Sequence, residues 1–209
     1  MRTIITGILL FFSILLYGQQ DPAAKSILDK FSGAALSSPA VTMSFMMKIH
    51  DRVEQSETES AGTVVIMDSM YKLTIPDNTI WFNGSATWTL TPEVKEVTVT
   101  LPDPEDNTFL TSPSSVFTMY RKDFKYRLVE ERAEGSIIDL YPEEPAETDF
   151  SRIRLVIKNE KLIAAEYRRK DGIDMYIDIT GYRLDKSYKS EYFTFNRDAH
   201  PGVDVIDMR

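Results

Sequence analysis

The residues of this sequence that could do chemistry are few and scattered. The 209 residues include two histidines, His50 and His200, and no cysteine. Neither histidine has a partner at metal-ligand spacing, and there is no G-x-S-x-G, P-loop or Rossmann glycine motif. We therefore expect a protein that is not an enzyme and that needs no metal, nucleotide or other cofactor.

The acidic clusters are interpreted as solvated surface charge. Glu130-Glu131 and Glu143-Glu144 are adjacent pairs whose side chains point apart, whereas the two carboxylates of a glycosidase come from separate strand ends. Asp103, Glu105 and Asp106 are closer to a calcium loop, but the required glycine and distal glutamate are missing. We expect no metal at either kind of cluster.

The N-terminus has the pattern of an export signal. Met1 and Arg2 precede an apolar run over residues 4–16, which has the length of a signal-peptide core and is too short for a permanent membrane span. The alternative is an uncleaved N-terminal anchor. We predict a cleaved signal peptide at residues 1–18 and one domain at residues 19–209.

Charge and cysteine content restrict the partners and the means of stabilisation. Removing Arg2 with the signal leaves 23 basic residues against 32 acidic ones, a net charge of −9. That balance argues against nucleic acid and against docking on anionic lipid headgroups. An exported chain without cysteine has no disulfides, but about 190 residues are enough to build a core without them.

The hydrophobic pattern predicts one helix followed by many strands. Asp21 and Pro22 suit the start of a helix over residues 22–36, and after Pro39 the apolar period changes to two. Asn83-Gly84 and Lys170-Asp171-Gly172 are tight-turn signals. The strand segments are 41–49, 62–67, 71–75, 80–82, 87–91, 97–101, 124–131, 137–141, 153–157, 162–169, 175–184, 192–195 and 203–206.

These short connections indicate an antiparallel meander of about ten or eleven strands that curls toward a barrel. The pattern breaks at residues 102–115, which are rich in Pro, Asp, Ser and Thr, and a short helical turn is predicted at residues 116–120. The predicted fold class is therefore mostly β (α+β), with one helix before the sheet and one short helix inside the chain.

Alternate residues of such a barrel line its interior, and methionine suits variable apolar shapes there. The alternative is that these residues are ordinary core, but a barrel-like meander with two spare helices favours an apolar cavity. The lining candidates are Met43, Phe45, Met47, Met67, Trp88, Leu90, Val97 and Val99.

The two helical segments are the predicted lid of this cavity. They are the places where apolar residues leave the period of two, and a curled sheet has one concave face to cover. The lid candidates are Ile27, Leu28 and Phe31 in the first helix, and Val116, Phe117 and Met119 in the second.

Two stretches of the sequence resemble the LolA family of periplasmic outer-membrane lipoprotein carriers. Residues 83–92, NGSATWTLTP, are similar to that family's D-G-x-T-x-W-x-Y-x-P segment. The end of the chain, from Phe193 to Asp207, resembles its F-x-F…P-x-G-V-x-V-x-D ending. Gly62, the opening helix and the mid-chain break fall in the matching order.

This resemblance implies a single antiparallel, unclosed β-barrel with a helical lid and an apolar cavity for the acyl chains of lipoproteins. The implied protein works in the periplasm as a monomer and shuttles lipoproteins from the inner to the outer membrane. Its implied partners are an inner-membrane lipoprotein-releasing transporter and an outer-membrane acceptor, and nucleic acid is not among them.

One departure from the family concerns the lid. Members carry an Arg after the second strand that hydrogen-bonds to the lid helices, but Met67-Asp68-Ser69-Met70 contains none. Tyr71 supplies the aromatic contact that normally follows, and it joins the predicted cavity set. Without that Arg, we expect lid closure to rest mainly on apolar packing.

Two alternatives to a carrier remain open. The first is an envelope-stress or lipid sensor of the same fold, which carries a second C-terminal domain, whereas this chain stops at Arg209 soon after the closing strand. The second is a structural β-domain with a solid core. Lipid that co-purifies with the protein favours the carrier or the sensor, and a bare protein mass favours the structural domain.

Overall fold

The computed structural model describes residues 20–103, 108–122 and 124–209. The predicted signal peptide and the acidic residues Glu105 and Asp106 lie outside the described residues. No helix within the described ranges is long and apolar enough to cross a membrane.

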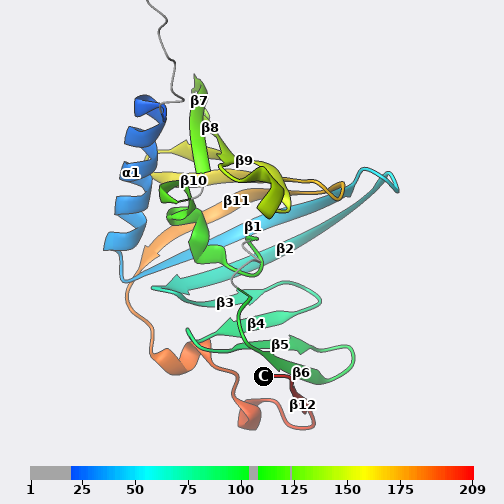
Figure 1. Ribbon diagram of the computed structural model, residues 1–209. Coiled ribbons are helices and arrows are strands. Elements are labelled where there is room, and N and C mark those ends of the chain that lie inside the picture. The colour runs from blue at the N-terminus through cyan, green and yellow to red at the C-terminus, as the bar shows by residue number, and fades with distance from the viewer. Residues whose placement is uncertain (1–19, 104–107, 123) are drawn as a thin grey trace, which may run out of the picture.

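The described residues form one mainly antiparallel sheet of 12 strands, with a helix packed on it (Figure 1). The spatial order is β12-β6-β5-β4-β3-β2-β1-β11-β10-β9-β8-β7, so the two edge strands, β12 and β7, are not paired with each other. The predicted mostly-β class and the unclosed sheet are thus confirmed. The strands are β1 (Ala40–Asp51), β2 (Ser56–Met67), β3 (Met70–Thr74), β4 (Thr79–Phe82), β5 (Thr87–Thr91), β6 (Glu96–Thr100), β7 (Phe124–Arg132), β8 (Gly135–Pro142), β9 (Phe150–Lys158), β10 (Lys161–Arg169), β11 (Ile173–Asp185) and β12 (Asp204–Asp207).

The first helix, α1 (Pro22–Ser37), begins where the sequence predicts it. The Asp21 side chain caps it by accepting hydrogen bonds from the backbone N–H groups of Ala23 and Ala24, at 2.9 and 3.2 Å. The same carboxylate accepts the N–H of Leu128 at 3.0 Å. One residue therefore starts the helix and ties it to β7.

The remaining helical segments are short 3-10 turns. The predicted mid-chain helix is divided into η1 (Pro113–Phe117) and η2 (Met119–Arg121), which lie in front of the sheet in Figure 1. The predicted strand at residues 192–195 was wrong, because η4 (Ser190–Phe193) extends into it. There Tyr188, Tyr192 and Phe193 pack on one another, with centroids 4.8–6.2 Å apart. The others are η3 (Pro145–Glu147) and η5 (Arg197–Ala199).

The last strand departs from the expected meander. β12 lies at the edge of the sheet and pairs with β6 in parallel, whereas the preceding strand β11 lies beside β1. The C-terminal segment therefore crosses the sheet before it joins that edge. We call the face of the sheet that carries Met43, Phe45 and Met47 the inner face, and the opposite face the outer face. The helix α1 packs on the inner face, and the C-terminal segment packs on the outer face of β4–β6.

Candidate functional site

The inner face of the central strand β1 is apolar and fully buried. Met43, Phe45 and Met47 alternate along it and are 0–5% exposed. They belong to one core cluster with Tyr71 of β3. Four of the nine predicted lining residues are therefore brought together on this face.

All six predicted lid residues lie in or against the same cluster. Leu28 and Phe31 of α1 are buried there with Val116 and Phe117 of η1, while Ile27 and Met119 pack against it. The rings of Phe31 and Phe117 are 5.4 Å apart, which joins the helix to the 3-10 turn. The side chains of the protein itself therefore fill the space between the sheet and these segments, which we call the lid (α1, η1 and η2).

Gly62 of β2, the cross-strand partner of Phe45, leaves room for the Phe45 ring on the inner face. A Cβ on Gly62 would lie 2.3 Å from Cζ of Phe45, well inside van der Waals contact. The phenyl ring crosses this gap and meets Phe109 edge-on, with centroids 5.3 Å apart. Gly62 is thus a packing requirement of the inner core.

Polar contacts hold η2 against α1. The Tyr120 hydroxyl donates to Asp29 Oδ1 at 2.7 Å, and Arg121 Nη2 donates to the buried Ser32 Oγ at 2.8 Å. Arg121 Nε also donates to the Tyr120 oxygen at 3.2 Å. Hydrogen bonds from Lys25 and then from Tyr120 hold the pKa of Asp29 below its usual value.

The expectation of a lid held mainly by apolar packing is therefore incomplete. Met67-Asp68-Ser69-Met70, after the second strand, contains no cation, but Arg121 belongs to the lid itself and bridges its two parts. The sequence signal for this role of Arg121 is a basic residue directly after the predicted helical turn at residues 116–120. It could not be interpreted without knowing that α1 lies alongside.

A cleft of about 400 Å³ opens on the inner face beside the lid, between η1 and β3–β6. Its floor is continuous with the core, because Tyr71 belongs to both, and Ile80, Phe82 and Leu110 line the cleft while packing against the core cluster. The Tyr71 hydroxyl donates to the Thr111 carbonyl at 2.7 Å, which ties β3 to the opposite wall. The lining residues are Ser69, Tyr71, Ile80, Phe82, Thr87, Thr89, Thr100, Leu101, Pro102, Asp103, Leu110, Thr111, Ser112 and Ser114.

The other five predicted lining residues lie on the outer face, which corrects the predicted lining. Leu90, Val97 and Val99 form a second cluster, and Trp88 packs against it. Met67 directs its sulfur to the backbone N–H of Tyr188, 3.4 Å away. The apolar alternation of these strands predicts that their large apolar residues face the interior, but in β5 the residues facing inward are threonines.

Side chains pack on both faces of β4–β6, and the apolar residues of β5 and β6 face the C-terminal segment. This is why their alternation predicted the wrong inward face. On the outer face Trp81 packs edge-on against Phe195 and His200, at 5.6 and 5.7 Å between centroids. His200 also lies against the Phe195 ring, and its Nδ1 is 2.8 Å from the Asn196 carbonyl oxygen. The C-terminal histidine is thus part of an aromatic stack.

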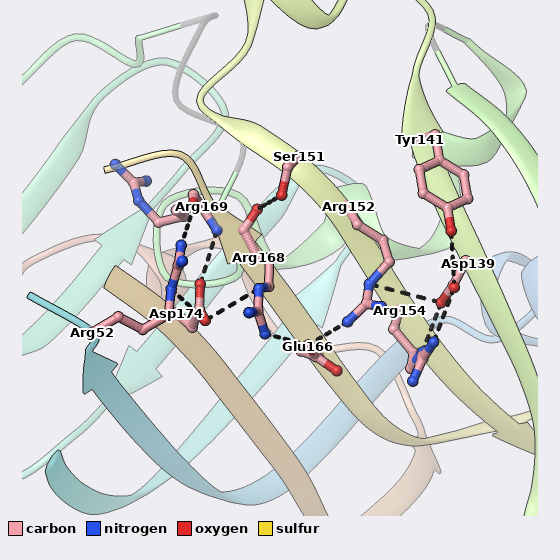
Figure 2. Close-up of polar contacts among 10 residues, drawn as sticks. All are labelled: Arg52, Asp139, Tyr141, Ser151, Arg152, Arg154, Glu166, Arg168, Arg169 and Asp174. Carbon is pink, nitrogen blue, oxygen red and sulfur yellow. Dashed lines mark hydrogen bonds and ion pairs between the residues drawn. The ribbon is translucent and has the colours of Figure 1, made fainter. Parts of the chain in front are cut away.

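The outer face of β8–β11 is covered by ion pairs. Basic and acidic side chains alternate across the strands and contact their neighbours in turn, as Figure 2 shows. Glu166 accepts from Arg152 at 2.5 Å, and Asp174, fully buried, is 3.0 Å from Arg52. The series runs through Arg154, Asp139, Arg152, Glu166, Arg168, Asp174 and Arg52.

Asp139 shows how this ladder of ion pairs is balanced. Burial alone would raise the pKa of Asp139, but the hydrogen bonds from Arg154 at 2.7 and 3.0 Å and the charges of Arg154 and Arg152 outweigh it. The pKa of Asp139 is therefore below its usual value. Among the described residues, no group of three or more His, Cys, Asp or Glu side chains is placed to hold a metal ion.

Comparisons with known proteins agree with this architecture. The chain resembles an uncharacterized conserved protein from Thermus thermophilus with a TM-score of 0.57 at 11% identity, covering 88% of this chain and 99% of that one. A LolA superfamily protein from Nitrosomonas europaea gives a TM-score of 0.45 at 13% identity, covering 82% and 97%. The Thermus protein shows a shared fold and nothing further.

No match to this chain is found among curated proteins. The sequence model of the family described as "Outer membrane lipoprotein carrier protein LolA" matches residues 15–137. That match covers more than half of the chain, from before α1 to the first part of β8. The chain therefore belongs to the LolA family of outer membrane lipoprotein carrier proteins.

Proposed function

We propose that this protein is a periplasmic carrier that binds the acyl chains of lipoproteins and shuttles them from the inner to the outer membrane. In this proposal a cleaved signal peptide at residues 1–18 exports the chain, and residues 19–209 act as one carrier domain. An inner-membrane lipoprotein-releasing transporter loads it and an outer-membrane acceptor unloads it. The protein performs no reaction and carries no cofactor.

One observation carries the proposal: the open cleft adjoins the buried apolar core. Tyr71 contributes to both. Met43, Phe45 and Met47 lie in the same apolar cluster, under the lid. Movement of α1 and η1 away from the sheet would therefore extend the cleft into an apolar chamber, whereas a cleft isolated from the core could hold only its own volume.

The energetics suit a carrier that must also release its cargo. Each acyl CH₂ group taken out of water contributes about 0.8 kcal/mol, so acyl chains cross an aqueous space only when they are buried. Here the ligand would replace contacts that Phe31 and Phe117 already make with the core. Binding is then an exchange of one apolar contact for another, and the net affinity stays low enough for release.

A pair of aromatic substitutions on opposite faces tests the proposal. Phe82 and Trp88 are both half-buried and lie on neighbouring strands, but Phe82 lines the cleft and Trp88 packs in the outer cluster. We expect Phe82→Asp to weaken uptake of a fluorescent fatty-acyl probe at least tenfold. Trp88→Asp should leave uptake unchanged as long as circular dichroism and gel filtration show a folded monomer.

Native mass spectrometry of the purified protein gives an independent measurement. We expect lipid to co-purify with the wild type and to be depleted in the Phe82→Asp variant. A bare mass together with no uptake of the acyl probe would contradict the carrier and support a structural β-domain. Uptake without transfer to acceptor membranes would instead favour a lipid sensor of the same fold.

A further inference from the structure

The cleft on the inner face has two chemically different parts. One part is apolar and aromatic, formed by Tyr71, Ile80 and Phe82 of β3 and β4. The other part is formed by Thr87 and Thr89 of β5 and Thr100 of β6. Threonine in a strand presents a methyl group and a hydroxyl together, so this part is able to contact an amphiphile at the end of its apolar chain.

The strand register places these threonines in a compact group beside the aromatic part. Thr87 is the cross-strand partner of both Phe82 and Thr100, and Thr89 is the partner of Ile80. Directly opposite Cβ atoms are about 4.5–5.5 Å apart, and residues two apart on one strand are separated by roughly 6.6 Å. Three hydroxyls thus lie within one small area at the polar end of an apolar surface.

The hydroxyls of this group are available to a ligand. Within the described part of the chain, Thr87, Thr89 and Thr100 make no side-chain hydrogen bond to another residue, although all three are half-buried. A hydroxyl both donates and accepts, so it suits carbonyl and hydroxyl groups alike. Occupation of the cleft by a purely apolar chain would cover these hydroxyls without giving them partners.

The charge of the cleft disfavours anionic ligands. Among the described lining residues there is no Lys, Arg or His, so the lining offers no cation to an anionic headgroup. A phosphate or carboxylate headgroup would lose water there without gaining a cation, and burial of an unpaired charge is strongly unfavourable. Neutral headgroups carry no such cost.

We propose that this cleft selects acyl amphiphiles with an uncharged hydrogen-bonding group next to the chain, and that Thr87, Thr89 and Thr100 bind that group. Ester and amide linkages, with their carbonyl oxygens, are the chemistry it takes. The acyl chain lies on Tyr71, Ile80 and Phe82 and continues toward the core. The inference rests on the proposed carrier function and adds the specificity of its binding site.

Ligands with the same saturated chain but different headgroups test the selection. We would measure displacement of a fluorescent acyl probe from the full mature protein by 1-palmitoylglycerol, palmitate and 1-palmitoyl lysophosphatidate. The neutral glycerol ester should bind at least tenfold more tightly than either anion.

Threonine variants locate the selective contact. Thr87→Val and Thr89→Val keep the shape of the side chain, and each should weaken the glycerol ester about threefold to tenfold, the range for one lost hydrogen bond. Thr89→Ser should restore most of that loss. Thr98→Val is the matched control, because Thr98 pairs with Thr89 on the same face but does not line the cleft.

The outcomes separate this inference from the carrier function. Equal affinity for the three ligands, or threonine variants that behave like the Thr98→Val control, would overturn the headgroup selection while leaving an acyl carrier. Failure of all three ligands and of the fluorescent probe to bind would contradict both. Melting temperatures close to the wild type for each variant rule out unfolding as the cause of any loss.

Discussion

The inner face of the sheet has two halves that differ in how they are covered. Beneath the lid, β1, β8 and β9 contribute Phe45, Leu140 and Leu155, which are buried in one cluster with residues of α1 and η1. Over β3–β6 the same face carries a cleft that is bordered by η1 and lined in part by Thr87 and Thr89. The comparison shows that one continuous sheet can carry a packed core at one end and an open cleft at the other.

On the outer face the two halves also differ, but there the half with the cleft is the one with an apolar cover. Under the cleft, the large apolar side chains Trp81 and Leu90 turn outward and are covered by the C-terminal segment. Behind the packed half, the outer face is covered by ion pairs such as Arg154 with Asp139. The cleft half is therefore packed on its outer face by this second cluster, while its inner face carries the open cleft.

The largest expected difference between the halves comes from removing one aromatic ring in each. Phe31→Ala empties a fully buried position and should lower the free energy of unfolding by about 3–5 kcal/mol. Phe82→Ala, at the half-buried floor of the cleft, should cost about 1 kcal/mol. Urea titrations followed by circular dichroism measure both. Equal losses would mean that the cleft half is as much a core as the lid half.

A glycine pair tests the tight packing beneath the lid. Gly62→Ala would place Cβ 2.3 Å from the Phe45 ring and should destabilise the protein by about 1–3 kcal/mol, as overpacking does. Gly181→Ala, on β11 on the other side of β1, meets nothing closer than 3.5 Å and is the control. Thermal unfolding of the two variants should differ clearly. A Gly62→Ala variant as stable as Gly181→Ala would show that the core beneath the lid yields easily.

The polar contacts of the lid should have a smaller effect on stability and a larger one on motion. Tyr120→Phe removes the hydroxyl that donates to Asp29 and should cost about 0.5–1.5 kcal/mol. Hydrogen exchange in α1 should become faster, while exchange in β9 and β10 stays slow. Tyr141→Phe, which removes a hydroxyl on the outer face, is the control and should leave α1 unchanged. Unaltered exchange in α1 of Tyr120→Phe would remove this contact from the lid mechanism.

The smallest expected effect is the pH dependence of the attachment of α1. The N–H groups of Leu128 and Ala24 hold the pKa of Asp21 below its ordinary value of 3.8. The stabilisation is therefore fully present above pH 3.8 and is lost as the pH falls through the lower, folded-state pKa. Unfolding measured between about pH 6 and pH 2 should show this loss, and Asp21→Asn should reduce it. If the wild type and Asp21→Asn lose stability over the same pH range and to the same extent, the role of this carboxylate is contradicted.

Much of the fold could be predicted because its signals are local. Asp21 and Pro22 mark the start of α1 at the residue where it occurs, and the period of two marks strands such as β1 and β9. The turn at Lys170-Asp171-Gly172 is also as predicted, with Gly172 at a φ of +94° and the Asp171 side chain accepting from Ile173. These features depend on neighbours in the chain.

The candidate site was predicted less well, because alternation alone does not say which face is inward. In β5 the residues Trp88 and Leu90 have the pattern of an interior, and only their cover of C-terminal residues shows that they face outward. The role of Arg121 was missed for a related reason. Its partner Ser32 is 89 residues away and an ordinary small residue in the sequence.

The amino-acid sequence alone was sufficient for the fold class, the helix start and most strands, because propensity, capping and hydrophobic period act over a few residues. The family followed from the motif stretches at residues 83–92 and 193–207. Contacts between distant segments decided the rest: Phe195 and His200 on Trp81, β12 beside β6, and Arg121 on α1. In β5 and β6 the apolar residues face the C-terminal segment and the threonines face the cleft, so the apolar alternation marks the outer face. Which face of β3–β6 is the inner one is therefore decided by the segments that pack on the two sides of the sheet.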